Sequence, residues 1–344
     1  MPTYPYYGRI KHQLGRRVVH FYFHPNLRSY RPLLPCLLRA AAERHMTTST
    51  VMPSERHEVI GGKKNFWLHS EADGFDLTHP ATPTSPPLYP RVPLETTKAR
   101  VAIDPAKSAL VVVDLQNYFL SPSLGRPADA VGLKAVDKLL QYAIPACRKV
   151  GIQIVWLNWS LTEQDIDEMP PTIVKGFAAD NNFDGDRRIK GLGSDVGPVE
   201  LEDGSVIKGG LVLMRDQWNT ASYTLLEEKH QPQDIWIHKN RLSGFWGGTA
   251  IEDVLTARGI RTLFFAGANT DQCVGTSLQD ACMKGWDCFL LSDGCATTSP
   301  KFAKQCIEFN SEQGWGFVLS CEDLAKGVDS MQTAPSNTET ESEL

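Results

Sequence analysis

From about residue 109 to residue 320, short continuous apolar runs alternate with segments whose apolar residues recur at helical spacing. Short continuous apolar runs, typical of strands buried on both faces, occur at residues 109–116, 152–159, 234–239, 261–268, 286–293 and 316–320. Helical patterns separate most of these runs, at residues 136–151, 249–259, 275–285 and 300–314. The alternation predicts an α/β fold of three layers, in which a doubly wound, mostly parallel sheet lies between helices.

An N-terminal segment, residues 46–100, does not follow this alternation. It is irregular and rich in proline, so we expect an extended arm. A wholly disordered linker would not need the aromatic residues that the segment contains. We therefore expect the arm to pack on the domain or on a neighbouring subunit through Phe66, Trp67 and Phe75.

Two further segments interrupt or end the pattern. Residues 160–233 contain loops rich in glycine and aspartate and a predicted hairpin turn at 201–206, which indicates an insertion at the carboxyl edge of the sheet. Residues 327–344 are polar and acidic and predict a disordered tail. The predicted domain therefore spans residues 101–326.

The formal net charge of −5 is distributed unevenly. Residues 1–45 carry eight Lys and Arg side chains and one acidic one, about +7, which leaves about −12 for the remainder. An acidic body without a basic stripe argues against nucleic acid as a partner. No apolar run approaches the ~20 residues that a membrane-spanning helix needs, so we expect no membrane partner.

The basic leader, residues 1–45, has two interpretations. Its composition is that of a mitochondrial presequence, which would place the protein in mitochondria. Its prolines, however, interrupt any long amphipathic helix, and an ordinary polar N-terminus begins at Met46. We prefer the second interpretation, a mis-assigned start and a cytoplasmic protein.

The chain contains eight cysteines at irregular spacings, with no CxxC pair and no secretory signal. This pattern supports neither a disulfide framework nor a zinc site. We expect reduced thiols.

Three predicted strands end in reactive side chains, namely Asp114, Lys239 and Cys273. Each has an ordinary alternative role, as a turn cap, a solvated strand end or a buried core sulfur. Ligands gather at the carboxyl ends of parallel strands, so the shared edge favours a catalytic site over three unrelated roles.

These segments, in this order, resemble the motifs of the isochorismatase-like cysteine hydrolases. Asp114 lies in "VVVDLQNYF", Lys239 follows a middle strand, and Cys273 lies in "AGANTDQCVGTSLQDA". The resemblance covers roughly residues 100–325 and implies the isochorismatase-like hydrolase fold. It is closest to the metal-free amidohydrolases and their fungal-type homologues.

The resemblance implies a catalytic triad. Cys273, at a predicted helix N-terminus beside the Lys239 cation, would be favoured as a thiolate. Asp114 would accept the thiol proton and return it to the leaving amine. The family's cis peptide maps to Ala268–Asn269, and its implied role is to aim the backbone N–H groups of Asn269 and Cys273 at an oxyanion.

Two departures from relatives narrow the expected reaction. Nicotinamidase relatives carry metal-ligating histidines after the second strand, whereas residues 155–171 contain none, so we expect no metal and no cofactor. Isochorismatases that cleave a vinyl ether lack the cysteine, so Cys273 favours cleavage of a C–N bond in a small carboxamide, ureido or N-carbamoyl compound. A vinyl-ether hydrolase using Asp114 as the acid, and a catalytically silent scaffold, remain as alternatives.

The walls of the substrate pocket are expected near the same strand ends. Core packing is the alternative role for the aromatic members. The resemblance also implies a homo-oligomer, a dimer or tetramer. The candidate substrate-binding residues are Asn117, Phe119, Asn158, Trp159, Phe245 and Trp246.

Overall fold

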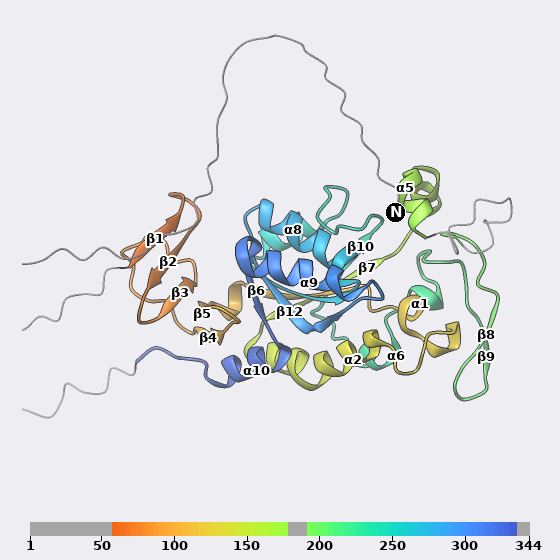
Figure 1. Ribbon diagram of the computed structural model, residues 1–344, viewed down its shortest axis with the longest axis horizontal. Coiled ribbons are helices and arrows are strands. Elements are labelled where there is room, and N and C mark those ends of the chain that lie inside the picture. Colours follow the sequence, from red (N-terminus) through yellow and green to blue (C-terminus); the bar gives the residue numbers. More distant parts are fainter. Residues whose placement is uncertain (1–56, 178–190, 336–344) are drawn as a thin grey trace, which may run out of the picture. The chain divides into compact units, whose positions relative to one another are not determined.

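Six parallel strands form the central sheet in the computed structural model, which describes residues 57–177 and 191–335 (Figure 1). The predicted leader, residues 1–45, lies outside the described residues. From edge to edge the strands are β10 (Ile235–Lys239), β7 (Gln153–Trp159), β6 (Ser108–Val113), β11 (Thr262–Ala268), β12 (Asp287–Ala296) and β13 (Phe317–Leu319). The predicted doubly wound parallel sheet is confirmed.

The order of the strands reverses between β6 and β11. The chain runs outward from β6 through β7 to β10, and then returns to β11 on the other side of β6. In open α/β sheets such a reversal leaves a crevice at the carboxyl ends of the two central strands, where ligands bind. The topology therefore predicts a ligand-binding crevice at the carboxyl ends of β6 and β11.

Helices cover both faces of the sheet (Figure 1). One face carries α2 (Val131–Lys138), α3 (Ile144–Val150) and α10 (Cys321–Asp329), and the other carries α8 (Gly275–Met283) and α9 (Lys301–Asn310). A π-helical turn, Leu139–Ala143, joins α2 to α3. The remaining helices are α1 (Asn117–Leu120), α4 (Glu163–Asp167), α5 (Pro171–Gly176), α6 (Thr224–Glu227) and α7 (Ile251–Ala257).

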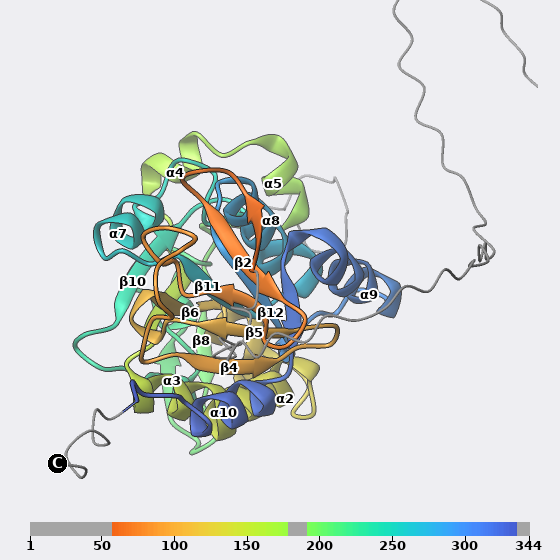
Figure 2. The same cartoon turned by 90° about the vertical axis from the view of Figure 1, so that its left-hand side faces the viewer.

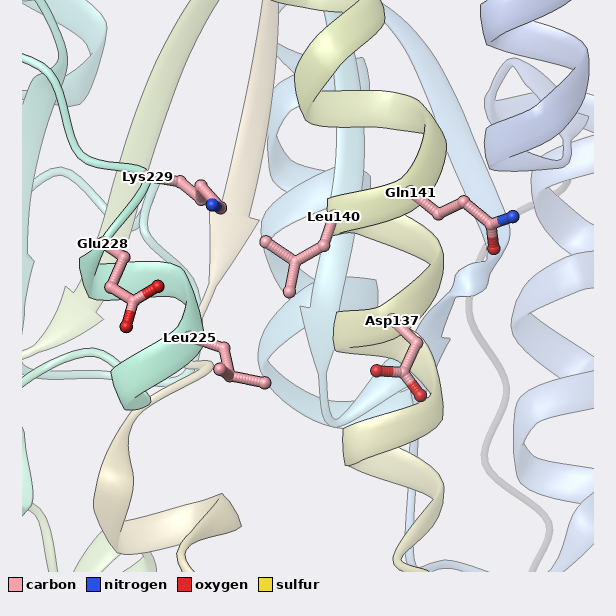
Figure 3. A pocket seen from close by; sticks show the side chains of 6 residues that line it. All are labelled: Asp137, Leu140, Gln141, Leu225, Glu228 and Lys229. Carbon is pink, nitrogen blue, oxygen red and sulfur yellow. The ribbon is translucent and has the colours of Figure 1, made fainter.

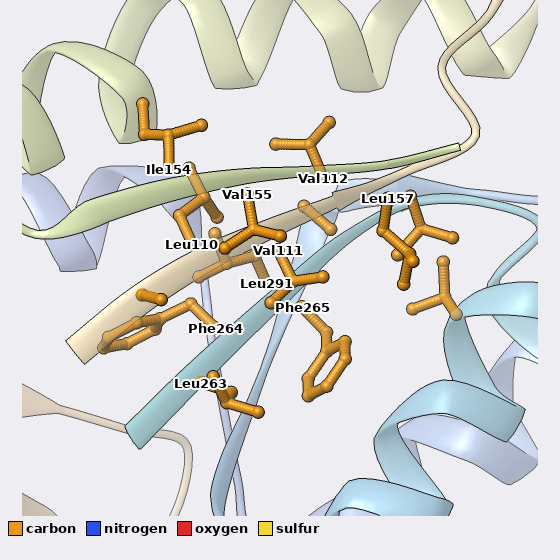
Figure 4. Close-up of a cluster of buried hydrophobic side chains, with 14 of the residues drawn as sticks. Leu110, Val111, Val112, Ile154, Val155, Leu157, Leu263, Phe264, Phe265 and Leu291 are labelled. Carbon is orange, nitrogen blue, oxygen red and sulfur yellow. The ribbon is translucent and has the colours of Figure 1, made fainter. Parts of the chain in front are cut away.

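The core lies between these layers, and the central strands supply most of it (Figure 4). Every residue of β6 is buried, because helices pack against both of its faces. Burying a large aliphatic or aromatic side chain contributes about 1.5–3 kcal/mol. This explains why β6 and β11 appear in the sequence as continuous apolar runs rather than alternating ones.

Residues 58–103 form a second sheet, so the expectation of an extended arm over residues 46–100 needs correction (Figure 2). Its strands are too short, at four or five residues, to produce a recognisable period-2 pattern, and a proline-rich connection, residues 78–91, interrupts them. The order is β1 (Glu58–Gly61), β2 (Phe66–Ser70), β3 (Gly74–Leu77), β5 (Arg100–Ile103) and β4 (Val92–Glu95).

This small sheet is attached to the central one through a buried carboxylate. Asp287, at the start of β12, accepts hydrogen bonds from Trp67 Nε1 at 2.7 Å and Thr262 Oγ1 at 3.2 Å. His79 Nε2 lies 2.6 Å from its second oxygen. The rings of Trp67 and Phe75 also pack on Phe317 of β13. The aromatic residues of the predicted arm thus pack on their own domain.

We expect Asp287→Asn to lower the free energy of unfolding by about 2 kcal/mol, because hydrogen bonds to a buried charge are worth about 1.5–3 kcal/mol. Urea denaturation measures this as a lower midpoint. Asp329→Asn is the control, since the Asp329–Lys149 pair is exposed and such pairs contribute little. Equal midpoints for the two variants would contradict the anchoring role of Asp287.

The predictions for the insertion, residues 160–233, and for the tail, residues 327–344, are correct only in part. The expected insertion at 160–233 contains the predicted hairpin, formed by β8 (Pro198–Glu200) and β9 (Val206–Lys208). The predicted tail from residue 327 begins too early, because α10 continues to Asp329 and Gln332 pairs with Arg91. In the two described ranges, none of the helices has the length and apolar character to cross a membrane.

Candidate active site

Three side chains from three strands meet at the carboxyl edge of the central sheet. Asp114 directly follows β6, Lys239 ends β10, and Cys273 lies just beyond β11. Lys239 Nζ is 2.8 Å from Asp114 Oδ2 and 3.4 Å from Cys273 Sγ. Their exposed fractions are only 1%, 1% and 5% for Asp114, Lys239 and Cys273. The structure thus brings together the three side chains that the sequence singled out.

The backbone at Asp114 is unusual. Its φ of 52° lies in the left-handed region, which few residues other than glycine adopt, although aspartate tolerates it better than most. Two hydrogen bonds with β7 hold the residue: its N–H donates to Leu157 O, and its Oδ1 accepts from Trp159 N at 3.0 Å. This conformation turns the carboxylate back over the end of the sheet, towards Lys239.

Lys239 is buried because β10 alternates buried and exposed residues, and Lys239 falls on the buried face. Its ammonium lies 4.1 Å from the centre of the Trp159 ring and donates to Arg241 O at 3.1 Å. The ring face, the carbonyl and the Asp114 carboxylate compensate for the lost hydration of the charge. The neighbouring His238 points to the opposite face and is exposed.

Cys273 lies in a π-helical turn, Thr270–Val274, that leads directly into α8. The expected cis peptide, Ala268–Asn269, is present at the end of β11. Before it, Gly267 has a φ of 125°, and a Cβ atom there would lie 2.0 Å from Val113 O. Only glycine therefore lets β11 run beside β6 at this point, which places Cys273 close to Asp114.

Burial dominates the electrostatics of the site. It raises the pKa of Asp114, while the charge and hydrogen bond of Lys239 act in the opposite direction. Burial also raises the pKa of the Cys273 thiol to about 12, against the lowering effect of Lys239. The direction of this shift favours the neutral thiol, whereas the sequence favoured a thiolate. Loss of water outweighs the lowering effect of Lys239.

A cavity of about 870 Å³ opens above Cys273. Asn269 and Cys273, the predicted oxyanion pair, both line it, as does the predicted wall residue Phe119. Sequence analysis missed several other lining residues. Tyr118 and Gln272 belong to the quoted motifs, but nothing in the motifs marks them as wall residues. The others come from segments that have no recognisable motif, and they include Arg126, Ile173, Phe177, Leu242 and Thr297.

Two predicted wall residues belong instead to the framework of the site. Trp159 is fully buried beneath Lys239, and its backbone is held by the side chain of Gln116. Asn117 is also buried, and its Nδ2 donates to Trp218 O at 3.0 Å. Trp159 contacts both Asp114 and Lys239, and neither Trp159 nor Asn117 lines the cavity.

Three further wall predictions are wrong. Asn158 lies on the opposite face of the sheet, in a separate hollow with Trp236 and His238. Phe245 is fully buried and packs on Phe265, because it belongs to the core beneath α7 and α8. Trp246 is 42% exposed, and the Arg241 guanidinium covers its ring. Neither aromatic residue reaches the cavity above Cys273.

Another hollow, between α2 and α6, has a different character (Figure 3). It is an open groove whose side chains include Leu140, Leu225 and the charged Asp137, Glu228 and Lys229. Its six described lining residues include no cysteine and no member of the triad, and none of them lines the cavity above Cys273.

No group of three or more His, Cys, Asp or Glu side chains within residues 57–177 and 191–335 is arranged to hold a metal ion. The triad itself supplies one carboxylate, one ammonium and one sulfur. The ammonium occupies the space beside the other two groups where a cation would sit.

Known proteins are similar to this chain in sequence and in structure. The family model described as the isochorismatase domain matches residues 205–320. Ureidoacrylate amidohydrolase RutB of Caulobacter segnis is 30% identical over 252 residues, which cover 72% of this chain and 95% of that protein. Among solved structures, N-carbamoylsarcosine amidase from Thermoplasma acidophilum is 22% identical with a TM-score of 0.44, and the match covers 63% of this chain and 97% of that one. A cysteine hydrolase from Pseudomonas syringae is 20% identical with a TM-score of 0.46, over 66% and 95% of the two chains.

Proposed function

Because the chain belongs to the isochorismatase-like cysteine hydrolase family, we propose that it is a cysteine-dependent amidohydrolase that cleaves the C–N bond of a small ureido, N-carbamoyl or carboxamide compound. The observation that carries the proposal is the contact of Lys239 with both Asp114 and Cys273, at the edge of a cavity large enough for a small molecule. The amide substrate of the curated relative is consistent with it.

The first half of the proposed reaction forms a thioester. Asp114 takes the proton from Cys273 as the sulfur attacks the carbonyl carbon of the substrate, so that the thiolate forms only when it is consumed. Lys239 stabilises the negative charge that passes from the carboxylate to the sulfur and then to the tetrahedral intermediate. The C–N bond then breaks, and the amine leaves with the proton returned by Asp114.

The second half restores the enzyme. A water molecule gives a proton to Asp114 and attacks the thioester carbon, the C–S bond breaks, and Cys273 recovers its proton. The products are the amine and a carboxylic or carbamic acid. The backbone N–H groups of Asn269 and Cys273 are the proposed donors to the oxyanion, since both residues line the cavity.

Trapping the acyl-enzyme tests this mechanism. We expect intact-mass spectrometry after acid quenching to show an adduct with the mass of the acyl or carbamoyl group, and peptide mapping to place it on Cys273. Ammonia or amine release should proceed in parallel. Turnover of a ureido or carboxamide substrate through a water attack that never modifies the protein would contradict the covalent route.

A further inference from the structure

One charged side chain, Arg126, lines the cavity above Cys273 among the lining residues that the structure describes. Most of the others are apolar or carry an uncharged hydroxyl or amide, for example Phe177, Leu242 and Gln272. Asp114 and Lys239 lie beneath this lining and neutralise each other. Among the residues that the structure describes, a ligand in the cavity therefore meets one uncompensated formal charge, and that charge is positive.

The guanidinium of Arg126 is held in a fixed position. Its Nε and Nη2 donate to the carbonyl oxygen of Tyr118 at 3.1 and 2.9 Å, and the guanidinium carbon lies 5.5 Å from the centre of the Tyr118 ring. Nη1 makes no hydrogen bond to the described residues, so donors remain available. A positioned arginine loses little side-chain entropy when it binds a carboxylate.

The place of Arg126 in the cavity suits a substrate with two ends. Arg126 is exposed, at the solvent side, whereas Cys273 is buried. Apolar side chains, among them Phe119 and Leu120, line the same cavity and suit a short hydrocarbon linker. An exposed guanidinium keeps its hydration and its charge, so it can pair with an anion without a large desolvation cost.

We infer that Arg126 selects substrates that carry a carboxylate, so that the substrate class is ureido acids or N-carbamoyl amino acids rather than neutral ureas. This inference rests on the proposed function, because it assumes that the C–N bond of the same molecule is presented to Cys273. The carboxylate pairs with Arg126 at the rim, and the ureido group lies at the buried end.

Two matched compounds test the inference. β-Ureidopropionate carries the carboxylate, and isopentylurea replaces it with an isopropyl group of similar shape. We expect the wild-type protein to favour the acid by at least about tenfold in kcat/KM, mainly through KM. Arg126→Gln should remove most of this preference by raising KM for β-ureidopropionate. Arg126→Lys should retain part of the preference. Isopentylurea makes no ion pair. A loss of its hydrolysis in Arg126→Gln would therefore measure the structural effect of the lost bond to Tyr118, and the additional loss for β-ureidopropionate would measure the effect of the charge.

A charge reversal provides the converse measurement. We expect Arg126→Glu to disfavour β-ureidopropionate and to favour N-carbamoylputrescine, whose ammonium replaces the carboxylate. Raising the ionic strength should reduce the wild-type preference, since the pair is exposed to solvent. A preference for the acid that survives both Arg126→Gln and Arg126→Glu would overturn the inference, as would a wild-type protein that treats the acid and isopentylurea alike.

A binding measurement tests the role of Arg126 separately if the proposed hydrolysis does not occur. If the wild-type protein hydrolyses neither urea, calorimetric binding to the Cys273→Ala variant, with and without Arg126→Gln, still compares the two compounds. Binding of β-ureidopropionate that depends on Arg126 would support the inference even though no hydrolysis occurs. Equal binding of both compounds, or binding of neither, would overturn it.

Discussion

Replacing Cys273 with alanine should reduce kcat/KM for a ureido or carboxamide substrate by about 10⁴-fold or more. Losses of this size occur when the nucleophile of a covalent mechanism is removed, because the remaining residues cannot form the intermediate. The fold should survive, because the change removes one sulfur atom beside a cavity. Steady-state kinetics with ammonia detection, together with a thermal unfolding scan, would measure both effects.

Cys147 offers a matched control for this experiment. It is fully buried, and burial raises the pKa of its thiol to about 12, as it does for Cys273. However, it lies in α3, away from Asp114 and Lys239. Cys147→Ala should therefore retain most of the activity. Turnover that survives Cys273→Ala would exclude the thioester mechanism, and pyruvate release from isochorismate that survives Cys273→Ser would favour vinyl-ether cleavage.

Replacing Lys239 with methionine should reduce kcat/KM at neutral pH by about 10³-fold and also destabilise the fold. The activity falls because the developing negative charge loses its counter-ion, an effect worth several kcal/mol in a buried site. The stability falls because the Asp114 carboxylate loses its partner at 2.8 Å, and breaking a buried pair costs about 3–5 kcal/mol. Kinetics and urea denaturation would measure the two effects separately.

The same variant should change the pH dependence. Lys239 lowers the pKa of Asp114 and of Cys273, so its removal raises both. The base must be ionised to accept the thiol proton, so activity is lost as the pH falls through the pKa of Asp114. The acid limb of kcat/KM should therefore move to higher pH in Lys239→Met. An unchanged limb would indicate that a group other than Asp114 is the base.

A double variant separates stability from catalysis. Asp114→Asn combined with Lys239→Met removes both charges, so no ion is left buried without a partner. We expect it to be more stable than Lys239→Met alone but less active, because the base is also lost. If the double variant were no more stable, the destabilisation would come from lost packing of the lysine side chain rather than from the orphaned carboxylate.

The central sheet and the triad could be predicted from the sequence because both depend on local patterns. A strand buried on both faces must be continuously apolar, and β6 is the clearest example. Asp114 and Lys239 sit at the carboxyl ends of such runs, and parallel strands bring these ends to one edge. The three positions therefore follow from the strand assignment, although their distances do not.

The cavity walls could not be predicted because they depend on contacts between distant segments. Phe177 and Thr297 belong to segments about 120 residues apart, and no periodicity relates them. The paired prediction of Asn158 and Trp159 also conflicted with strand geometry, since consecutive side chains point to opposite faces. The structure assigns Trp159 to the face of Lys239 and Asn158 to that of His238.

The protonation state of Cys273 was also beyond the sequence. A lysine and a helix terminus near a cysteine suggest a thiolate, and both features are present in the sequence. The opposing effect is the loss of water around the sulfur, which becomes known only when the exposed fraction of 5% is known. Burial then decides the balance in favour of the thiol.

The junction between the two sheets has a practical consequence for anyone who truncates the gene. Strand β5 ends at Ile103, and only a short turn separates it from β6, which Asp114 directly follows. A shortened gene product that started at residue 101 would discard β1 to β4 and leave the carboxylate of Asp287 without Trp67 and His79. Tags and fusion partners should accordingly be joined upstream of Glu58, so that the minimal catalytic fragment keeps its N-terminal sheet.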